Sequence, residues 1–159
     1  MRWFRFAVLI LTVTILQKGV LARWDNKPDL LLIMLVFSAT YFITSDAIMG
    51  SFLAGFAADL IGSPMPMGPH MISFGVFGTL LAYLNRVIAI RRMPYQAMAI
   101  FVMGLLVGVL THLLAGESLS RNVLTAVLVT SVYSAFVGPF LAAPSAWWVG
   151  IRPQHLRRR

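Results

Sequence analysis

The sequence predicts an all-α, polytopic membrane protein with about six transmembrane helices and no soluble domain. Of its 159 residues, 59% are hydrophobic and only 11% are charged, whereas about a quarter of the residues of a soluble domain are charged. The length leaves room for about six spans of ~20 residues. The basic residues cluster at the ends of apolar runs. We therefore expect residues 1–159 to form one integral membrane domain.

The first expected span runs from Trp3 to about Ala22. Its basic start and the apolar run 6–16 also fit a secretory signal peptide, and residues 20–22 resemble a cleavage site. We favour a retained span, because the segments that follow are themselves membrane spans and Gln17-Lys18 interrupts the cleavage region.

The second and third expected spans, residues 29–44 and 46–62, are short and form a hairpin. Pro28 has a fixed φ that suits the first turn of a helix, and Asp29 is favourably placed at the positive end of the helix dipole. Sixteen residues cover about 24 Å, less than the hydrocarbon core of about 30 Å. The glycines and prolines of residues 62–69 then end the third helix.

The remaining spans are expected at residues 69–90, 94–115 and 121–141. The fourth ends in arginines, Pro94 opens the fifth, and Ser120 is a suitable N-cap for the sixth. Gly138-Pro139 should kink or loosen the last turns of the sixth span.

The stretch 47–68 is the one around which the sequence is organised. At helical spacing its small residues form two adjacent stripes, and small residues at every fourth position let helices approach closely in a membrane. Gly104 and Gly108 form a second such face, with His112 on the same stripe. The bulky half of the third span holds Met49, Phe52, Leu53, Phe56 and Leu60. The candidate packing or partner-contact residues are Ser51, Ala54, Gly55, Ala58, Asp59, Gly104, Gly108 and His112, and the candidate loop or kink positions are Pro28, Gly62, Gly68 and Pro139.

Asp59 is the only acidic residue inside an apolar stretch, and it lies at the negative end of its own helix dipole. Such a residue requires compensation. The candidate partners are the amides that begin the fourth span, His112, or a basic residue of the first outer loop. The alternative is a carboxylate that simply faces the lipid headgroups.

The distribution of basic residues predicts that both termini are cytoplasmic. With the N-terminus inside, nine lysines and arginines lie on the cytoplasmic side and four outside, as the positive-inside rule requires. The Arg157–Arg159 tail then faces anionic lipid. Membrane topology thus accounts for the net charge of +8, and no motif for nucleic-acid binding accompanies it.

The sequence gives no sign of an enzyme or a cofactor. It contains no H-E-x-x-H, no G-x-S-x-G and no cysteine, and its few acids do not form a catalytic pair. His70, His112, Asp59 and Glu117 are all expected near the outer face, but none of them share the helical spacing typical of metal ligands. We therefore expect no catalytic residue, cofactor or metal.

Three segments resemble one bacterial family. Lys27-Pro28-Asp-Leu-Leu-Leu-Ile, then Gly50-Ser-Phe-Leu-Ala-Gly-Phe-Ala-Ala-Asp-Leu-Ile-Gly62, then Met67-Gly68 are similar to rod shape-determining protein MreD. The matching positions are Pro28, Ser51 in place of a glycine, Gly55, Asp59, Leu60 and Gly68. The Pro64-x-Pro66 loop and Met67 depart from the family pattern.

The resemblance implies a non-enzymatic inner-membrane subunit of the elongation machinery, which binds MreC and helps couple MreB filaments to peptidoglycan synthesis. The small-residue stripes suggest that one face is free to receive another protein's helix. The alternative is a transporter subunit, such as the substrate-binding component of an energy-coupling vitamin importer. Those components dock through small residues on the first helix, and residues 6–16 here are mostly bulky. A third reading, an intramembrane hydrolase, would need Asp59 or His112 for activity.

Overall fold

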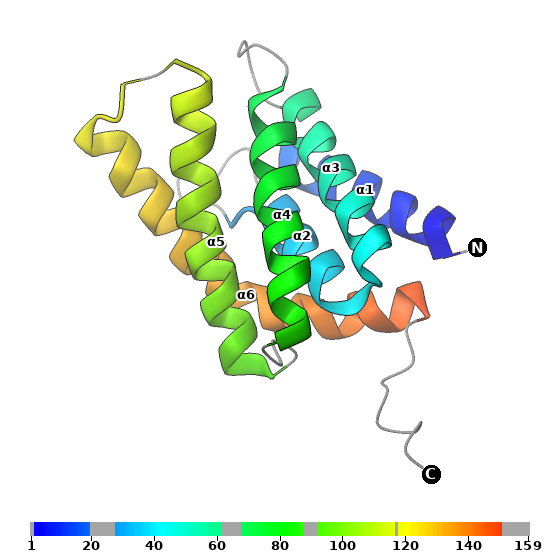
Figure 1. Ribbon diagram of the computed structural model, residues 1–159. Coiled ribbons are helices and arrows are strands. Elements are labelled where there is room, and N and C mark those ends of the chain that lie inside the picture. Colours follow the sequence, from blue (N-terminus) through cyan, green and yellow to red (C-terminus); the bar gives the residue numbers. More distant parts are fainter. Residues whose placement is uncertain (1, 20–27, 62–67, 88–91, 117, 151–159) are drawn as a thin grey trace.

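The computed structural model describes residues 2–19, 28–61, 68–87, 92–116 and 118–150, and this part of the chain is entirely helical (Figure 1). Within these ranges there are six helices and no strand. The helices are α1 (Arg2–Gly19), α2 (Leu30–Tyr41), α3 (Thr44–Ile61), α4 (Pro69–Val87), α5 (Met93–Leu114) and α6 (Arg121–Val149).

The short helix α2 is the centre of the bundle. It contacts each of the other five helices, and every residue from Leu30 to Thr40 is buried. A helix that is apolar all round is either buried in protein or exposed to lipid, and α2 is enclosed by protein. Its 12 residues cover only about 18 Å at the usual rise. The organising element is therefore α2, rather than the third span that the sequence had suggested, and α2 ends at Tyr41 instead of Thr44.

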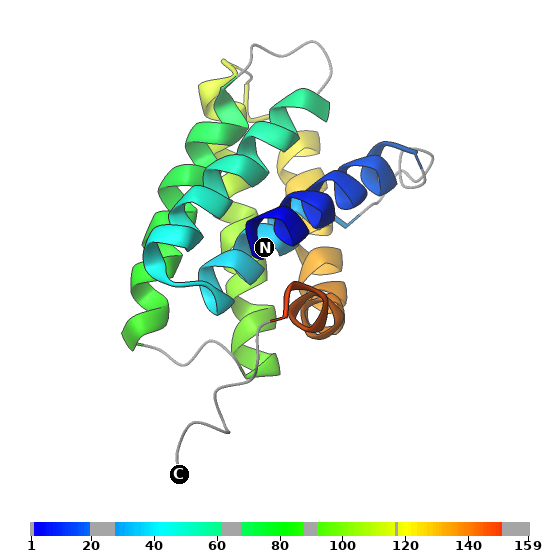
Figure 2. The ribbon, with the colours of Figure 1, turned by 90° about the vertical axis from the view of Figure 1, so that its right-hand side faces the viewer.

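Helices α3, α4 and α5 lie side by side and alternate in direction, whereas α1 crosses the bundle obliquely (Figures 1 and 2). The most extensive packing joins α3 to α4 and α5 to α6. The end of α3, the start of α4 and the end of α5 consequently meet at one edge of the bundle. The exposed Arg86 and Arg92 lie toward the opposite ends of α4 and α5.

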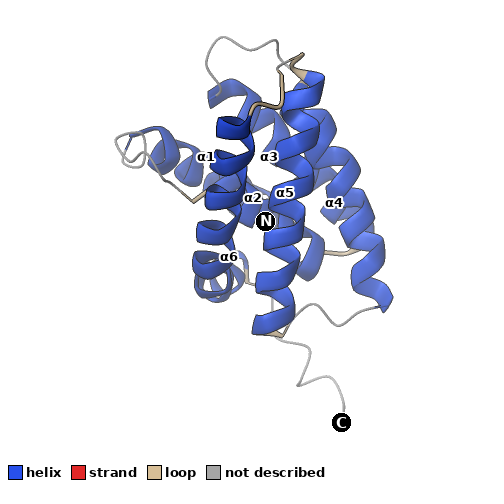
Figure 3. Ribbon diagram, turned by 90° about the vertical axis from the view of Figure 1, so that its left-hand side faces the viewer, coloured by secondary structure: helices blue, strands red, loops and turns tan. Residues whose placement is uncertain are grey.

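Helix α6 is longer than predicted, because it continues through Pro139 and Pro144 to Val149 instead of ending at Leu141. Proline removes one backbone donor and bends a helix, but the flanking turns can persist when neighbouring residues hold them. The first half of α6 runs alongside α5, and the second half crosses beneath the bundle and is seen end-on in Figures 2 and 3. Gly150 ends the helix in the left-handed conformation, with φ 75°.

The other predicted spans match the observed helices to within a few residues, although positions 20–22, 62 and 88–90 lie outside the described part. Ser120 is the N-cap of α6, as predicted, and accepts a hydrogen bond from the Val123 amide. By length and composition, two of the described helices, α5 and α6, are able to cross a membrane, and α2 is apolar but shorter.

Candidate packing and partner-contact site

The carboxylate of Asp59, near the end of α3, caps the first turn of α4. It accepts hydrogen bonds from the backbone amides of Gly68, His70 and Met71, each at 3.0 Å. The first amides of a helix have no intrahelical partner, and they carry the positive end of the helix dipole. The intervening residue, Pro69, has no amide hydrogen to satisfy. Asp59 thus obtains the compensation that the sequence led us to expect from the start of the fourth span.

The imidazole bonded to Asp59 belongs to His70, whose Nδ1 lies 3.0 Å from Oδ1. Because a carboxylate only accepts, Nδ1 of His70 is the donor. The Asp59 side chain is only 5% exposed, and that of His70 is 29% exposed. From the sequence, His112, and not His70, is the candidate histidine partner of Asp59. In the structure, the His112 Nδ1 lies 2.8 Å from the carbonyl oxygen of Gly108 in its own helix.

Gly55 lies one turn before Asp59 and allows α4 to sit directly on α3. A Cβ atom added at Gly55 would lie 2.7 Å from both the His70 carbonyl oxygen and the Met71 Cα, and 2.9 Å from the Phe74 Cβ. Two of these three atoms are backbone, so no change of rotamer could relieve the overlap. Gly55 therefore sets the distance between the two helices at the point where Asp59 caps α4.

The other small residues of α3 also pack within the chain. Ser51 is buried and occupies the space beside Gly78 of α4, whereas Gly50 lies against Ser38 of α2 and Phe6 of α1. Ala54 is fully buried, and Ala58 is half-buried against the core.

One assignment to the bulky face of α3 is corrected by the structure. The ring of Phe52 lies over Gly75 of α4, so this side chain belongs partly to the helix interface. Phe56 and Leu60, by contrast, are 48% and 51% exposed.

The glycine face of α5 is covered by α6. A Cβ atom at Gly104 would lie 2.6 Å from the Ser131 Oγ, and one at Gly108 would lie 2.5 Å from a methyl group of Val127. In the described part of the chain, the glycines of α3, α4 and α5 all face other helices of the same molecule. The expectation that one of these stripes is left open for a partner helix is therefore corrected.

Polar side chains cap both ends of α2, and of these the sequence predicts only Asp29 at a helix end. At its start, Asp29 Oδ1 accepts bonds from the Leu31 and Leu32 amides at 3.0 and 3.2 Å, and from Gln17 Nε2 at 3.2 Å. At its end, Asn85 Nδ2 of α4 donates to the Ala39 and Thr40 carbonyls at 3.2 and 3.0 Å. The sequence signal that could have identified these contacts is the presence of two polar residues, Gln17 and Asn85, inside otherwise apolar spans.

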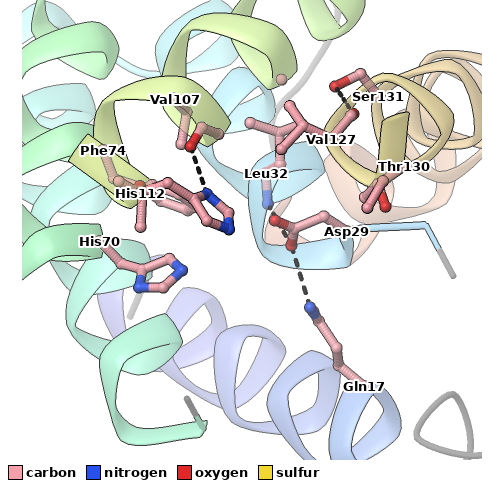
Figure 4. A pocket seen from close by; sticks show the side chains of 14 residues that line it. Gln17, Asp29, Leu32, His70, Phe74, Val107, His112, Val127, Thr130 and Ser131 are labelled. Atoms are coloured by element: carbon pink, nitrogen blue, oxygen red, sulfur yellow. Dashed lines mark hydrogen bonds between the residues drawn. The ribbon is translucent and has the colours of Figure 1, made fainter. Parts of the chain in front are cut away.

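Near the end of α5, a cavity of about 340 Å³ opens between five helices (Figure 4). Asp29 lies on one wall, and the imidazoles of His70 and His112 lie on the other. The residues that line it are Gln17, Asp29, Leu32, His70, Phe74, Gly104, Val107, Gly108, Thr111, His112, Ala126, Val127, Thr130 and Ser131.

The remaining sequence candidates are placed as follows. Pro28 precedes the N-cap of α2 instead of occupying its first turn. Gly68 has φ 128°, a conformation that favours glycine, and Pro139 is buried within α6. Gly62 and Glu117 lie outside the described residues. Among the residues that are described, no three of His, Cys, Asp or Glu are grouped as metal ligands.

In the comparison with protein families, the family described as rod shape-determining protein MreD matches residues 1–148 of the chain. The chain belongs to the MreD family. The resemblance seen in the sequence is thereby confirmed over nearly the whole chain. MreD is a family of shape-determining membrane proteins and not a known enzyme family. No curated protein and no solved structure matches the chain.

Five of the six MreD-like positions of the sequence lie at one junction of the fold, and the sixth, Pro28, precedes the N-cap of α2. Ser51, Gly55, Asp59 and Leu60 follow one another along α3, and Gly68 directly precedes α4. Three of these five residues are in contact with α4 or cap it: Ser51 beside Gly78, Gly55 beneath the first turn, and Asp59 at the amides. The α3–α4 junction is therefore the candidate functional site.

Proposed function

We propose that this MreD-family chain is a non-enzymatic, multi-pass subunit of the bacterial inner membrane, with both termini in the cytoplasm. It binds a single-span protein resembling MreC and helps to couple MreB filaments to the enzymes of peptidoglycan synthesis. The observation that carries this proposal is the family match over residues 1–148.

The arrangement of the helices supports an adaptor role. Two polar side chains hold helix ends in place: Asp59 accepts from amides at the start of α4, and Asn85 donates to carbonyls at the end of α2. In a membrane, backbone groups at helix ends must be satisfied internally, because lipid offers no hydrogen bonds. A rigid bundle of this kind is suited to presenting a fixed surface to a partner.

The structure also changes the proposed role of the candidate residues. Since Ser51, Ala54, Gly55 and Gly104 are buried against helices of this chain, they shape the bundle instead of contacting the partner directly. We propose that the partner's span lies along an exposed apolar surface of the α3–α4 hairpin, which includes Phe56 and Leu60 of α3.

Co-purification tests this proposal. The tagged wild-type protein, extracted in mild detergent, should retain a single-span MreC-like protein. Gly55→Leu should lose it, because leucine would force α4 away from α3. Phe136→Leu, at an exposed position of α6 away from the α3–α4 hairpin, should retain it. A stable wild-type protein that never retains such a partner would refute the proposed association.

A further inference from the structure

The cavity between α1, α2, α4, α5 and α6 is a formed space for which the proposed adaptor role has no use. Its volume of about 340 Å³ falls within the range of roughly 300–1,000 Å³ that is typical of small-molecule sites. Part of its lining is apolar, from Leu32, Phe74, Val107 and Val127. This combination of size and lining suits a small ligand with an apolar body.

One wall of the cavity carries a carboxylate oxygen to which none of the described residues donates a hydrogen bond. Oδ1 of Asp29 accepts all three of the carboxylate's hydrogen bonds, from Gln17, Leu31 and Leu32. Oδ2 accepts none from the described residues, and it is not among their buried polar atoms that lack a partner. Oδ2 is therefore accessible and can accept a hydrogen bond from a ligand.

The opposite wall adds a second acceptor. His70 uses Nδ1 as the donor to Asp59, and in a neutral imidazole with this tautomer the other nitrogen, Nε2, is an acceptor. Figure 4 shows the His70 imidazole facing the space across from Asp29. Among the described residues that line the cavity there is no lysine and no arginine. The ligand that this lining favours is thus one that brings its own hydrogen-bond donors and a positive charge.

We propose that this cavity binds a small organic ammonium compound, with its charged group at Asp29 and its apolar body against Phe74 and Val107. Charged groups in apolar surroundings are retained where they are paired. An ammonium group would supply that pairing to Asp29 Oδ2 without disturbing the bonds that cap α2. Phe56 and Leu60, which we assign to the partner surface, do not line this cavity, although His70 and Phe74 belong both to its wall and to the α3–α4 junction.

Benzylammonium is a suitable probe, because it combines an aromatic ring with a single ammonium group. We would measure its binding to the purified full-length protein in detergent by ligand-observed NMR, with benzyl alcohol as the uncharged isostere. A charge-assisted hydrogen bond contributes about 1.5–3 kcal/mol, so benzylammonium should bind at least roughly tenfold more tightly than benzyl alcohol.

Two variants separate the site from partition into detergent. Asp29→Asn retains a good N-cap and should abolish the preference for the ammonium. Ala126→Trp fills the cavity from α6 and should abolish saturable binding, whereas Ala143→Trp, at an exposed position of α6 outside the lining, should leave it unchanged. Equal binding of the two probes to the wild type, or unchanged binding in Ala126→Trp, would overturn the proposal. Because the partner is absent from this assay, either result leaves the adaptor proposal to its own test.

Discussion

At the scale of single residues, Asp59 shows how one charge is accommodated at the junction of two helices. At the end of α3 it faces the negative pole of its own helix, but the amides that begin α4 surround it with donors. The carboxylate thus sits at the positive pole of a second helix. The same contact fixes the geometry of the α3–α4 turn.

We predict that Asp59→Leu lowers the free energy of unfolding by about 2 kcal/mol, the upper end of the range for loss of an N-cap. Three amides of α4 would lose their acceptor, and His70 would lose its partner. Asp59→Asn keeps one acceptor oxygen and should cost less. The measurement is denaturant-induced unfolding in detergent. If Asp59→Leu were as stable as the wild type, the carboxylate would have no capping role.

Gly55 and Gly138 provide a matched pair of helical glycines. Alanine gains about 1 kcal/mol of helix propensity over glycine at either site. At Gly55 the new Cβ would meet the backbone of α4, whereas at Gly138 it would meet Cδ1 of Ile100, the tip of a flexible side chain. We therefore predict that Gly55→Ala lowers the melting temperature clearly and that Gly138→Ala changes it little. Equal effects would show that the close approach at Gly55 is not limiting.

At the scale of residues, the sequence predicts which side chain needs a hydrogen-bond partner better than it predicts which residue provides that partner. The isolated acid at position 59 and the start of α4 were linked correctly, because a carboxylate at the wrong pole of its helix requires donors. The choice of His70 over His112 depends on the turn formed at Gly68 and Pro69, whose geometry is not encoded in helical periodicity. Helical periodicity showed that Gly104 and Gly108 face a helix, but not that this helix is α6.

At the scale of secondary-structure elements, α2 is a short helix enclosed by the other five, capped at its start by the adjoining Asp29 and at its end by Asn85 of α4. Its sequence, Leu30 to Phe37, is apolar on every side. In a membrane such a run fits contact with lipid as well as burial in protein, so periodicity could not identify α2 as the centre. The extent of α6 was missed for a related reason, since prolines indicate a bend but not whether tertiary contacts keep the following turns.

The C-terminal cap of α2 leads to a further prediction. Asn85 donates two hydrogen bonds to the Ala39 and Thr40 carbonyls. Asn85→Asp is nearly isosteric but replaces the donor by a carboxylate, so we expect a loss of stability of about 1–3 kcal/mol. Asn85→Gln keeps the amide and should lose less. Thermal unfolding in detergent would distinguish the two, and equal melting temperatures would argue against the cap.

At the scale of the whole molecule, the alternation of α3, α4 and α5 predicts on which side of the membrane each connection lies. We expect residues 62–67 outside, and residues 88–91 and the basic C-terminus inside. Because the chain has no cysteine, single substitutions such as Ser63→Cys and Arg91→Cys can report accessibility directly. An impermeant thiol reagent added to intact spheroplasts should label position 63 and not position 91. The reverse pattern would contradict the proposed orientation.

The central claim is that this MreD-family chain maintains rod shape through an intact α3–α4 junction. The most direct measurement is the shape of cells of a rod-shaped host that lack the gene and are complemented with variants at equal membrane abundance. Loss should give rounded cells; the wild type and the α6 control Phe136→Leu should restore rods, and Gly55→Leu should not. Cells that remain rod-shaped without the protein, or that Gly55→Leu restores as well as the wild type does, would contradict the claim.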